Sequence, residues 1–384
     1  MNGSRISADW LASDEAQAVC AMLTKAGYQA YFVGGCVRNT LMGAPVSDLD
    51  IATDARPDVV IALAQSAGFK PIPTGIEHGT VTVVINTIAF EITTFRRDVE
   101  TDGRRAIVAF SDKVDDDARR RDFTMNALYV SASGELIDPL GGLEDLRTRT
   151  VRFIEDPETR IREDYLRILR FFRFYAWYGD QDAGIDADGL AACADNIDGL
   201  ASLSNERIGH EIRKLLLAPD PGPAVASMEA SGVLNALLPG VSARALPVMI
   251  HLEQGKNIAP NFVRRLAAFG GDNLDERLRL TKSETRDLVR LREATGNAGE
   301  LGYRLGADLA VSALLLRAAS LGVWIEDSEI DAARNGAAKV FPITAADLMP
   351  DLSGPALGAA LKRLEDEWVA SGFSLSRKSL LQRV

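Results

Sequence analysis

Two short motifs near the N-terminus carry residues suited to phosphate and metal chemistry. Gly34 and Gly35 end an apolar run, and Asp48 and Asp50 open the next apolar stretch. Glycines at a strand end let backbone N–H groups face an anion, and a following helix adds the positive end of its dipole. Two carboxylates two residues apart on a strand point to one side and can hold a hard cation. This order favours phosphoryl or nucleotidyl transfer over a glycine turn with a solvated acidic loop.

Arg38 and Glu91 are charged residues that could serve the same site. Arg38 stands about one turn into the helix expected after the diglycine, so it could reach a phosphate; the alternative is a surface ion pair. Glu91 falls within residues 88–95, a run typical of a strand, where acidic residues are uncommon. It could join the aspartates as a third carboxylate, but an outward-facing strand residue fits the spacing equally well.

Residues 119–126 are predicted to start a helix that carries Arg121, Asp122 and Asn126. A cation, an acceptor and an amide so close together could contact a nucleotide. From the residues alone, however, a capped helix with ion pairs is the favoured interpretation. The charged stretch before it, 96–118, is predicted to be a mobile loop.

Residues 160–176 show helical periodicity, with apolar side chains on one face and charged ones on the other. Asp164 and Arg167 are three residues apart, which makes them neighbours on a helix. A carboxylate that only accepts, beside a guanidinium that only donates, can pair with cytosine or adenine but fits uracil and guanine badly. The alternative is an ordinary surface ion pair.

The stretch 31–54 resembles the GG-x-V-R…D-x-D signature of the nucleotidyltransferase superfamily that includes DNA polymerase β. The form is that of class II CCA-adding enzymes and poly(A) polymerases. The resemblance continues, in the family's order, through 120–127 (RRDFTMNA), 138–142 (DPLGG), 162–170 (REDYLRILR) and 205–208 (NERI). Two positions depart from the family's usual residues: Asn39 stands where Asp is common, and Tyr165 where Pro is common.

The resemblance implies a role for each candidate residue. Asp48 and Asp50 would be the Mg²⁺ ligands and catalytic carboxylates, with Glu91 as the third carboxylate. The residues implied in nucleotide binding are Gly34, Gly35, Arg38, Arg121, Asp122, Asn126, Asp164, Arg167, Arg170 and Arg207.

The activity implied by the resemblance is addition of C, C and A to the 3′ acceptor end of tRNA from CTP and ATP. Poly(A) polymerases and enzymes that add only CC or only A share these motifs and remain alternatives. A rival from another class is a non-catalytic RNA-binding protein that keeps the fold, although the intact aspartate pair speaks against it.

Length and composition set the frame for these expectations. The 384 residues carry 54 acidic and 43 basic side chains, net −11, so RNA would have to meet local basic patches. Three scattered cysteines argue against a disulfide framework or a cysteine zinc site. With no signal peptide and no membrane-spanning run, we expect a cytoplasmic protein.

The expected fold is an α/β head with a mixed sheet and helices, of the polymerase β type, followed by an all-α neck, body and tail. We expect the head at 1–145, a neck with base recognition at 146–220, and a tRNA-binding body and tail at 221–384.

Overall fold

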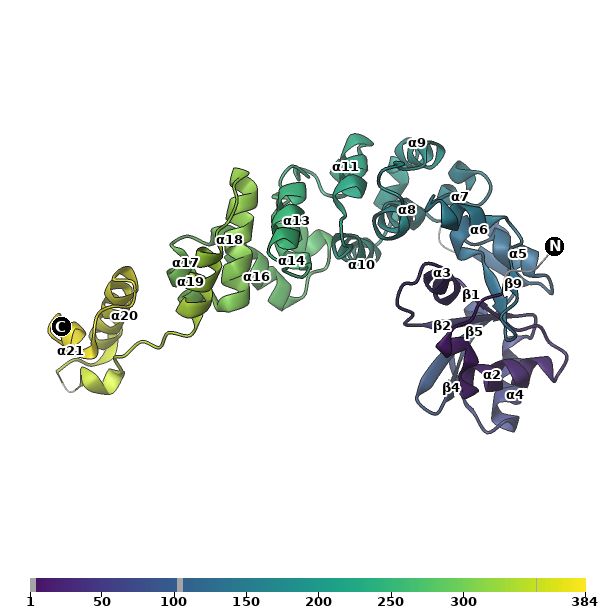
Figure 1. Cartoon of the computed structure of the whole chain (residues 1–384), viewed down its shortest axis with the longest axis horizontal. Helices are drawn as coiled ribbons and strands as arrows, with labels where there is room; N and C mark the ends of the chain where they lie inside the picture. Colours follow the sequence, from purple (N-terminus) through teal and green to yellow (C-terminus); the bar gives the residue numbers. More distant parts are fainter. Residues whose placement is uncertain (1–4, 102–105, 350) are drawn as a thin grey trace. The chain divides into compact units, whose positions relative to one another are not determined.

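The computed structural model describes residues 5–101, 106–349 and 351–384, which fall into two compact units. We call Met1–Glu211 with Pro223–Leu237 the head unit, and Ile212–Gly222 with Leu238–Val384 the C-terminal unit. Figure 1 labels the elements of both. The chain leaves the head unit after Glu211, returns at Pro223 and leaves again after Leu237.

A seven-stranded mixed sheet forms the centre of the head unit (Figure 1). Its strand order is β3-β4-β5-β2-β1-β8-β9. Strands β2 (Leu49–Thr53) and β5 (Ile88–Thr94) are parallel, whereas β1 is antiparallel to both β2 and β8. The remaining strands are β1 (Tyr31–Val33), β3 (Lys70–Gly75), β4 (Thr80–Ile85), β8 (Tyr129–Ser131) and β9 (Leu136–Ile137). The predicted α/β head with a mixed sheet is therefore confirmed.

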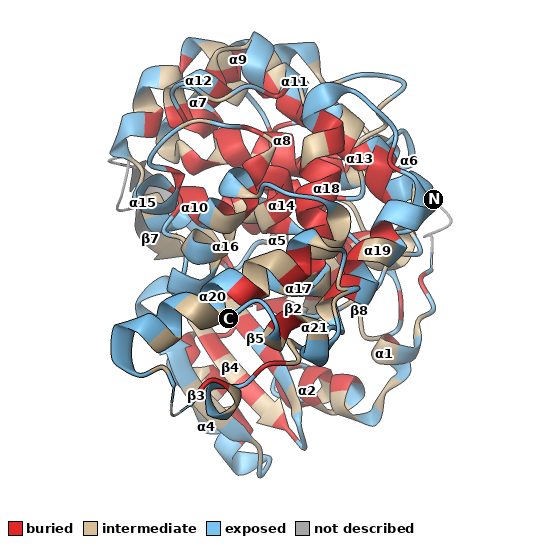
Figure 2. Ribbon diagram, turned by 90° about the vertical axis from the view of Figure 1, so that its left-hand side faces the viewer, coloured by how far each residue is buried: buried red, intermediate tan, exposed pale blue. Residues whose placement is uncertain are grey.

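Strands β4 and β5 form a hairpin in which buried residues alternate with less buried ones (Figure 2). Val81, Val83 and Ile85 are buried on β4, and Phe90 and Ile92 on β5. Since side chains alternate along a strand, one face of the hairpin packs into the core while the other carries Glu91.

The helices of this part follow from ordinary start signals. Helix α2 (Asp14–Thr24) begins after Ser13, whose hydroxyl accepts a hydrogen bond from the Ala16 N–H, and α4 (Pro57–Ser66) begins with its proline. Helix α4 packs on β3, β4 and β5. The other short helices are α1 (Asp9–Ala12), α3 (Gly35–Leu41) and the 3₁₀ turn Ile76–His78.

The structure corrects two expectations for the middle of the head unit. Residues 96–118 are not a plain loop: they form strands β6 (Arg96–Thr101) and β7 (Ala106–Phe110) and helix α5 (Val114–Arg119). The helix expected at 119–126 is reduced to the 3₁₀ turn Thr124–Asn126. The acidic residues in the first turn of α5 stabilise this helix, because they lie at the positive end of its dipole.

Helices and aromatic rings complete the head unit. Rings of Phe123, Phe153, Phe171 and Phe174 stack at centroid distances from 4.9 to 6.3 Å and join the sheet region to α8. Asp138 caps α6 by accepting hydrogen bonds from the N–H groups of Gly142 and Leu143. The helices are α6 (Gly142–Arg147), α7 (Pro157–Glu163), α8 (Leu166–Tyr178), α9 (Ala187–Asp195), the 3₁₀ helix Ile197–Ser202, α11 (Gly222–Ala230) and α12 (Val233–Leu237).

The C-terminal unit is helical, and glycines allow its closest helix crossing. A Cβ at Gly302 would lie 1.9 Å from the Ala333 carbonyl oxygen, and one at Gly336 would lie 2.0 Å from that of Gly299. Helices α17 and α19 therefore touch backbone to backbone. The helices are α10 (Asn205–Leu216), which begins in the head unit, α13 (Leu246–Gly255), α14 (Phe262–Ala267), α15 (Leu274–Arg277), α16 (Lys282–Glu293), α17 (Ala298–Leu305), α18 (Ala307–Leu321), α19 (Asp327–Ala337), the 3₁₀ turn Ala345–Asp347, α20 (Gly354–Ala370) and α21 (Arg377–Leu381). No helix within the described residues is long and apolar enough to cross a bilayer.

A buried ionic cluster ties the end of α10 to the C-terminal unit. Glu253 pairs with both Arg264 and Arg265, and all three side chains are buried. Arg265 also donates to the carbonyl oxygens of Leu216 and Ala218, just where α10 ends. Each charge thus has partners, which is what burial of ions requires.

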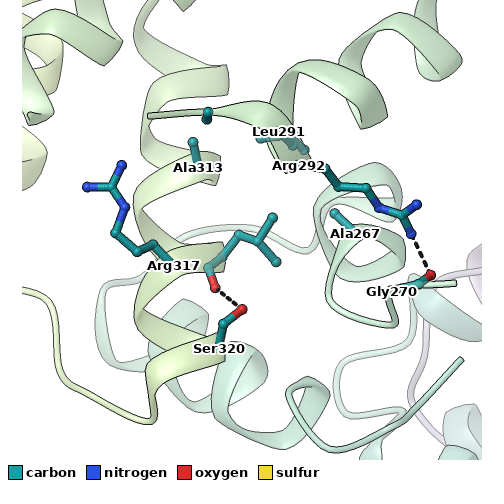
Figure 3. Close-up of a pocket in the computed structure, with 9 residues that line it drawn as sticks. Ala267, Gly270, Leu291, Arg292, Ala313, Arg317 and Ser320 are labelled. Carbon is teal, nitrogen blue, oxygen red and sulfur yellow. Dashed lines mark hydrogen bonds between the residues drawn. The ribbon is translucent and has the colours of Figure 1, made fainter. Parts of the chain in front are cut away.

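Helices α14, α16 and α18 enclose a hollow of about 390 Å³ (Figure 3). Its wall includes Ala267, Ala313 and the arginines Arg292 and Arg317. Arg292 donates to the carbonyl oxygens of Gly270 and Gly271, and Arg317 to that of Gly296. Both guanidinium groups therefore bind the loops at its rim, as Figure 3 shows for Arg292 and Gly270.

Candidate active site

The diglycine turn follows β1 and starts helix α3, as predicted. Gly34 has φ +74°, a conformation that L side chains rarely adopt. A Cβ on Gly34 would lie 3.5 Å from Nη1 of Arg121, and one on Gly35 would lie 3.9 Å from Nη2 of Arg38. Two guanidinium groups thus lie beside the turn, which is the charge expected around a phosphate.

The carboxylates gather at the start of β2 and on the neighbouring strand. Asp50 lies in β2 and is in register with Glu91 of β5, so both side chains leave the sheet on the same face. Asp48 is exposed, precedes the strand by one residue, and accepts a hydrogen bond from Ser47 Oγ at 2.9 Å. The expectation that both aspartates lie on the strand is therefore correct for Asp50 only.

The surroundings of Asp50 disfavour its charge. Burial raises the pKa of its carboxyl to about 6, and the negative charges of Glu91 and Asp48 add to this shift, while Arg121 opposes it. Negative charge is thus concentrated on two neighbouring inner strands of the sheet, β2 and β5. The positive charge of Arg121 works to lower the pKa of Asp50, and the same guanidinium lies beside Gly34. Asp50 and the diglycine turn therefore share one guanidinium.

These donors fit a hard divalent cation, because carboxylate oxygens are its preferred ligands and a cation would relieve the repulsion around Asp50. In the part of the chain that the structure describes, no three Asp, Glu, His or Cys side chains are arranged to hold a metal ion. Asp48 and Asp50 stay the predicted ligand pair, and the charge of Glu91 on the neighbouring strand acts on Asp50.

Arg121 is held by a residue that the sequence interpretation missed. Asp117 of α5 is buried and accepts hydrogen bonds from Arg121 Nη2 at 3.0 Å, Arg120 Nε at 3.0 Å and the Tyr129 hydroxyl at 2.9 Å. Burial works to raise the pKa of Asp117, but Arg121 and Arg120 outweigh it and lower the pKa to about 2. The i+3 and i+4 spacing to the two arginines is a signal that could have identified this pairing.

Arg38 is buried rather than on the surface. Its Nη1 donates to Asn126 Oδ1, and its Nε and Nη2 donate to Asn39 Oδ1 at 3.1 and 2.9 Å. Nη2 also donates to the hydroxyl oxygen of Tyr178, whose ring centroid lies 4.0 Å from the guanidinium carbon. The alternative of a surface ion pair is wrong.

The buried residues Asp122 and Asn126 form one network with the half-buried Arg170. Asp122 Oδ1 accepts from Asn126 Nδ2 at 2.8 Å, and Oδ2 accepts from Arg170 Nε at 2.7 Å. Burial acts to raise the pKa of Asp122, yet Arg170 and Asn126 reverse the effect and lower it to about 2. Because Asn126 also accepts from Arg38, the network joins the diglycine turn to helix α8.

The predicted pair Asp164 and Arg167 is divided by a break in the helix. Asp164 has extended backbone (φ −153°), and α7 ends before it while α8 begins at Leu166. Asp164 Oδ2 accepts from Arg207 Nη2 at 2.7 Å, whereas Arg167 pairs with Glu163. The expectation of one continuous helix over 160–176 is therefore wrong, whereas recognition of a base by Asp164 and Arg167 stays a prediction.

The two sets of candidate residues nevertheless lie close together. Arg167 Nη2 donates to the carbonyl oxygen of Arg120 at 3.2 Å, and Arg160 Nη2 donates to that of Arg121 at 2.7 Å. Arg167, which is expected to read the base, thus contacts the main chain of the residue before Arg121. This arrangement can bind a nucleotide by its phosphates and its base together.

Comparison with known families agrees with this geometry. Residues 30–152 match the family described as the poly A polymerase head domain. Residues 184–244 match the probable RNA and SrmB-binding site of polymerase A.

Several known proteins are similar over most of the chain. The human mitochondrial CCA tRNA nucleotidyltransferase 1 is 31% identical over 94% of this chain and 88% of its own length. The crystal structure of the Bacillus stearothermophilus CCA-adding enzyme in complex with CTP matches with a TM-score of 0.72 and 29% identity, over 93% of this chain and 92% of that one. The Thermotoga maritima CCA-adding enzyme, solved with tRNA, matches with a TM-score of 0.71 at 16% identity, over 100% and 98% of the chains, which shows a shared fold.

Proposed function

The chain belongs to the family of CCA tRNA nucleotidyltransferases, and from this we propose that it adds C, C and A to the 3′ end of tRNA. The substrates are CTP, ATP and a tRNA acceptor end, and no template strand takes part. The observation that carries the proposal is the position of Arg121, which lies beside Gly34 and acts on the charge of Asp50. A triphosphate on the diglycine turn would therefore lie next to the carboxylates.

Nucleotidyltransferases of this superfamily generally use a divalent metal ion. We propose Mg²⁺ as that ion, with Asp48 and Asp50 as its ligands and Glu91 as a third carboxylate nearby. When bound, Mg²⁺ supplies charge neutralisation for the triphosphate and a lower pKa for the attacking 3′-hydroxyl.

The chain's own residues bind and orient the nucleotide in this proposal. Gly34 and Gly35 leave room for the phosphates, and Arg38 and Arg121 offset their charge. Asp122, Asn126 and Arg170 form the polar wall that receives the ribose and phosphates. The hydrogen bonds within this wall hold its donors and acceptors in place before the nucleotide arrives.

We propose that Asp164 and Arg167 select cytosine and adenine, with Arg207 holding Asp164. Asp164 offers acceptor oxygens to an exocyclic amine, and Arg167 offers donors to ring acceptors. The break between α7 and α8 lets these side chains leave their present partners independently. Uracil and guanine present the wrong donor and acceptor pattern to such a pair.

We propose a division of labour along the chain: the nucleotidyltransferase head at 1–145, the base-selecting neck at 146–220, and a body and tail at 221–384 that bind tRNA. RNA of this kind is bound through its shape and its phosphates. We also propose a cytoplasmic location.

An incorporation assay tests the proposal and separates its rivals. Purified protein receives tRNA without its 3′ CCA together with labelled CTP and ATP. Ordered addition that stops at CCA is expected. Long A tracts would instead identify a poly(A) polymerase, addition of CC or A alone a partial enzyme, and no incorporation a non-catalytic RNA-binding protein.

The Asp48→Ala variant tests the metal pair in the same assay. It should lower the rate by about 10³-fold or more, since a metal ligand supports several kcal/mol of transition-state stabilisation. The matched control is Asp58→Ala, which removes an exposed carboxylate from the first turn of α4. Equal rates for the two variants would contradict the role of Asp48.

A further inference from the structure

Among the residues that the structure describes, no carboxylate forms an ion pair with the buried guanidinium of Arg38. Its described hydrogen bonds go to the amide oxygens of Asn39 and Asn126 and to the hydroxyl of Tyr178, all of which are neutral. Asp122 lies near enough for its charge to act on Arg38, and Asn126 forms hydrogen bonds with both. Burial lowers the pKa of Arg38, and Tyr178 and Asp122 oppose that effect. A buried cation without a counter-ion favours the arrival of an anion.

The guanidinium of Arg38 lies beside the diglycine turn. The nitrogen Nη2 that donates to Tyr178 is also the atom that would lie 3.9 Å from a Cβ on Gly35. A triphosphate bound at this turn would therefore lie beside the positive charge of Arg38. Because Nη2 already donates to Asn39 and Tyr178, this guanidinium would attract the phosphates through its charge, and these two contacts hold that charge in place.

Tyr178 is the residue that holds this nitrogen from the far side. It is the last residue of α8, 140 positions from Arg38 in the chain. Its hydroxyl oxygen accepts from Nη2 at 2.9 Å, and its ring lies 4.0 Å from the guanidinium carbon. Phe174, one turn earlier on α8, lies 5.1 Å away and adds a second aromatic contact. A ring face and a hydroxyl together restrict both the position and the tilt of the guanidinium.

We propose that Tyr178 is a positioning residue that sets the affinity of the site for the triphosphate of CTP and ATP by holding Arg38 at the diglycine turn. The inference rests on the proposed function, because it assigns Arg38 to the phosphates. Among the described contacts, Tyr178 binds Arg38, whereas Asp164 pairs with Arg207 and Arg167 with Glu163. Removal of Tyr178 must therefore affect both nucleotides equally.

Steady-state kinetics of CCA addition by the full chain test this with Tyr178→Phe and Tyr178→Leu. Tyr178→Phe keeps the ring and should raise KM for both CTP and ATP by about tenfold, the effect of losing one hydrogen bond to a charged group. Tyr178→Leu also loses the ring and should raise both KM values by about thirtyfold. In both variants kcat should stay within about twofold, and the CTP to ATP ratio should not change.

The matched control is Tyr175→Phe, which removes a hydroxyl from the same helix at a residue outside the described contacts of Arg38. It should leave both KM values unchanged. A purely structural role for Tyr178 would lower kcat through loss of folded enzyme, with KM unaffected, and that result would overturn the proposal. A change for only one of the two nucleotides would overturn it as well.

Equilibrium binding of CTP and ATP separates this proposal from the proposed function. If the wild-type chain incorporates nothing, the proposed function fails, but binding can still be measured. Weaker binding of both nucleotides by Tyr178→Phe would then support the role of Tyr178. Equal binding by this variant and the wild type, or no binding by either, would overturn it.

Discussion

Asp50 is held where its charge is unfavourable. The pKa of its carboxyl rises from 3.8 to about 6 through burial and through the charges of Glu91 and Asp48. Between these two values the folded chain binds more protons than the unfolded chain, so stability falls as pH rises through this window. Well above pH 6 this loss of folding stability is complete, because Asp50 is then charged in the folded chain as well. A cation bound beside Asp50 would offset that charge and stabilise the site.

Asp50→Asn should therefore stabilise the chain while abolishing its activity. In the absence of divalent cations at pH 7.5, we expect a gain of about 1 to 2 kcal/mol in the free energy of unfolding. The gain should vanish well below pH 3.8, where Asp50 is protonated in both states. Denaturant melts at the two pH values measure it. Glu91→Gln should give a smaller gain, and a loss of stability in Asp50→Asn at pH 7.5 would refute the account.

Single residues were predictable where the chemistry lies in local spacing. Gly34 and Gly35, with Asp50 after them, could be identified because each motif spans only a few positions. The partner of Arg38 could not be predicted, because Tyr178 is 140 residues away and reaches it only through the packing of α8. Asp117 could have been predicted from its i+3 and i+4 spacing to Arg120 and Arg121. It was missed because the charged stretch around it is typical of a loop.

Helix α8 illustrates what periodicity can and cannot predict about an element. The apolar pattern over 160–176 correctly indicates one buried face, since Ile161, Ile168 and Leu169 are all buried. The break at Asp164 does not disturb that pattern, so hydrophobic spacing alone cannot reveal it. In the fold, Asp164 Oδ1 accepts a hydrogen bond from the Leu166 N–H at the start of α8, and the Tyr165 ring packs so closely on Gly199 that a Cβ there would lie 2.0 Å from it.

The break between α7 and α8 predicts how the selection of cytosine and adenine weakens when Arg167 is removed. Arg167→Ala removes donors from the α8 side while leaving Asp164 and its pair with Arg207 intact. UTP and GTP should then compete about tenfold better against CTP and ATP, because the site no longer has the N–H donors of Arg167 to distinguish the bases. Competition assays with labelled nucleotides measure this ratio.

Arg162→Ala is the control for that experiment, because it removes an exposed guanidinium from α7 that pairs with Glu158. Its selectivity should equal that of the wild type. Should Arg167→Ala also keep wild-type selectivity, Arg167 would be only the ion-pair partner of Glu163.

At the scale of the whole molecule, the order of the motifs along the chain predicted the class of fold. The mixed sheet in the head and the helices after it follow that expectation. The excursion of the chain, in which residues Pro223–Leu237 return to the head unit, could not be predicted. It depends on contacts such as that of Ile197 with Gly232, which join segments distant in sequence. No local pattern encodes such pairs.

Because the chain forms two compact units, we expect a mutation inside one unit to change the stability of that unit alone. Gly302→Ala forces a Cβ to within 1.9 Å of the Ala333 carbonyl oxygen and should destabilise the C-terminal unit by about 1 to 3 kcal/mol. Gly358→Ala on α20 is the matched control: its Cβ meets open space, so the better helix propensity of alanine should stabilise by about 0.5 to 1 kcal/mol.

Calorimetry with and without CTP distinguishes the units, because a ligand raises the unfolding temperature of the unit that binds it. CTP should shift the transition of the head unit in the wild type and in both variants. Gly302→Ala should lower only the other transition and weaken tRNA binding at temperatures near it, with CTP affinity unchanged. A single transition that Gly302→Ala and CTP both shift would instead mean that the sheet and the distant helices unfold as one cooperative body.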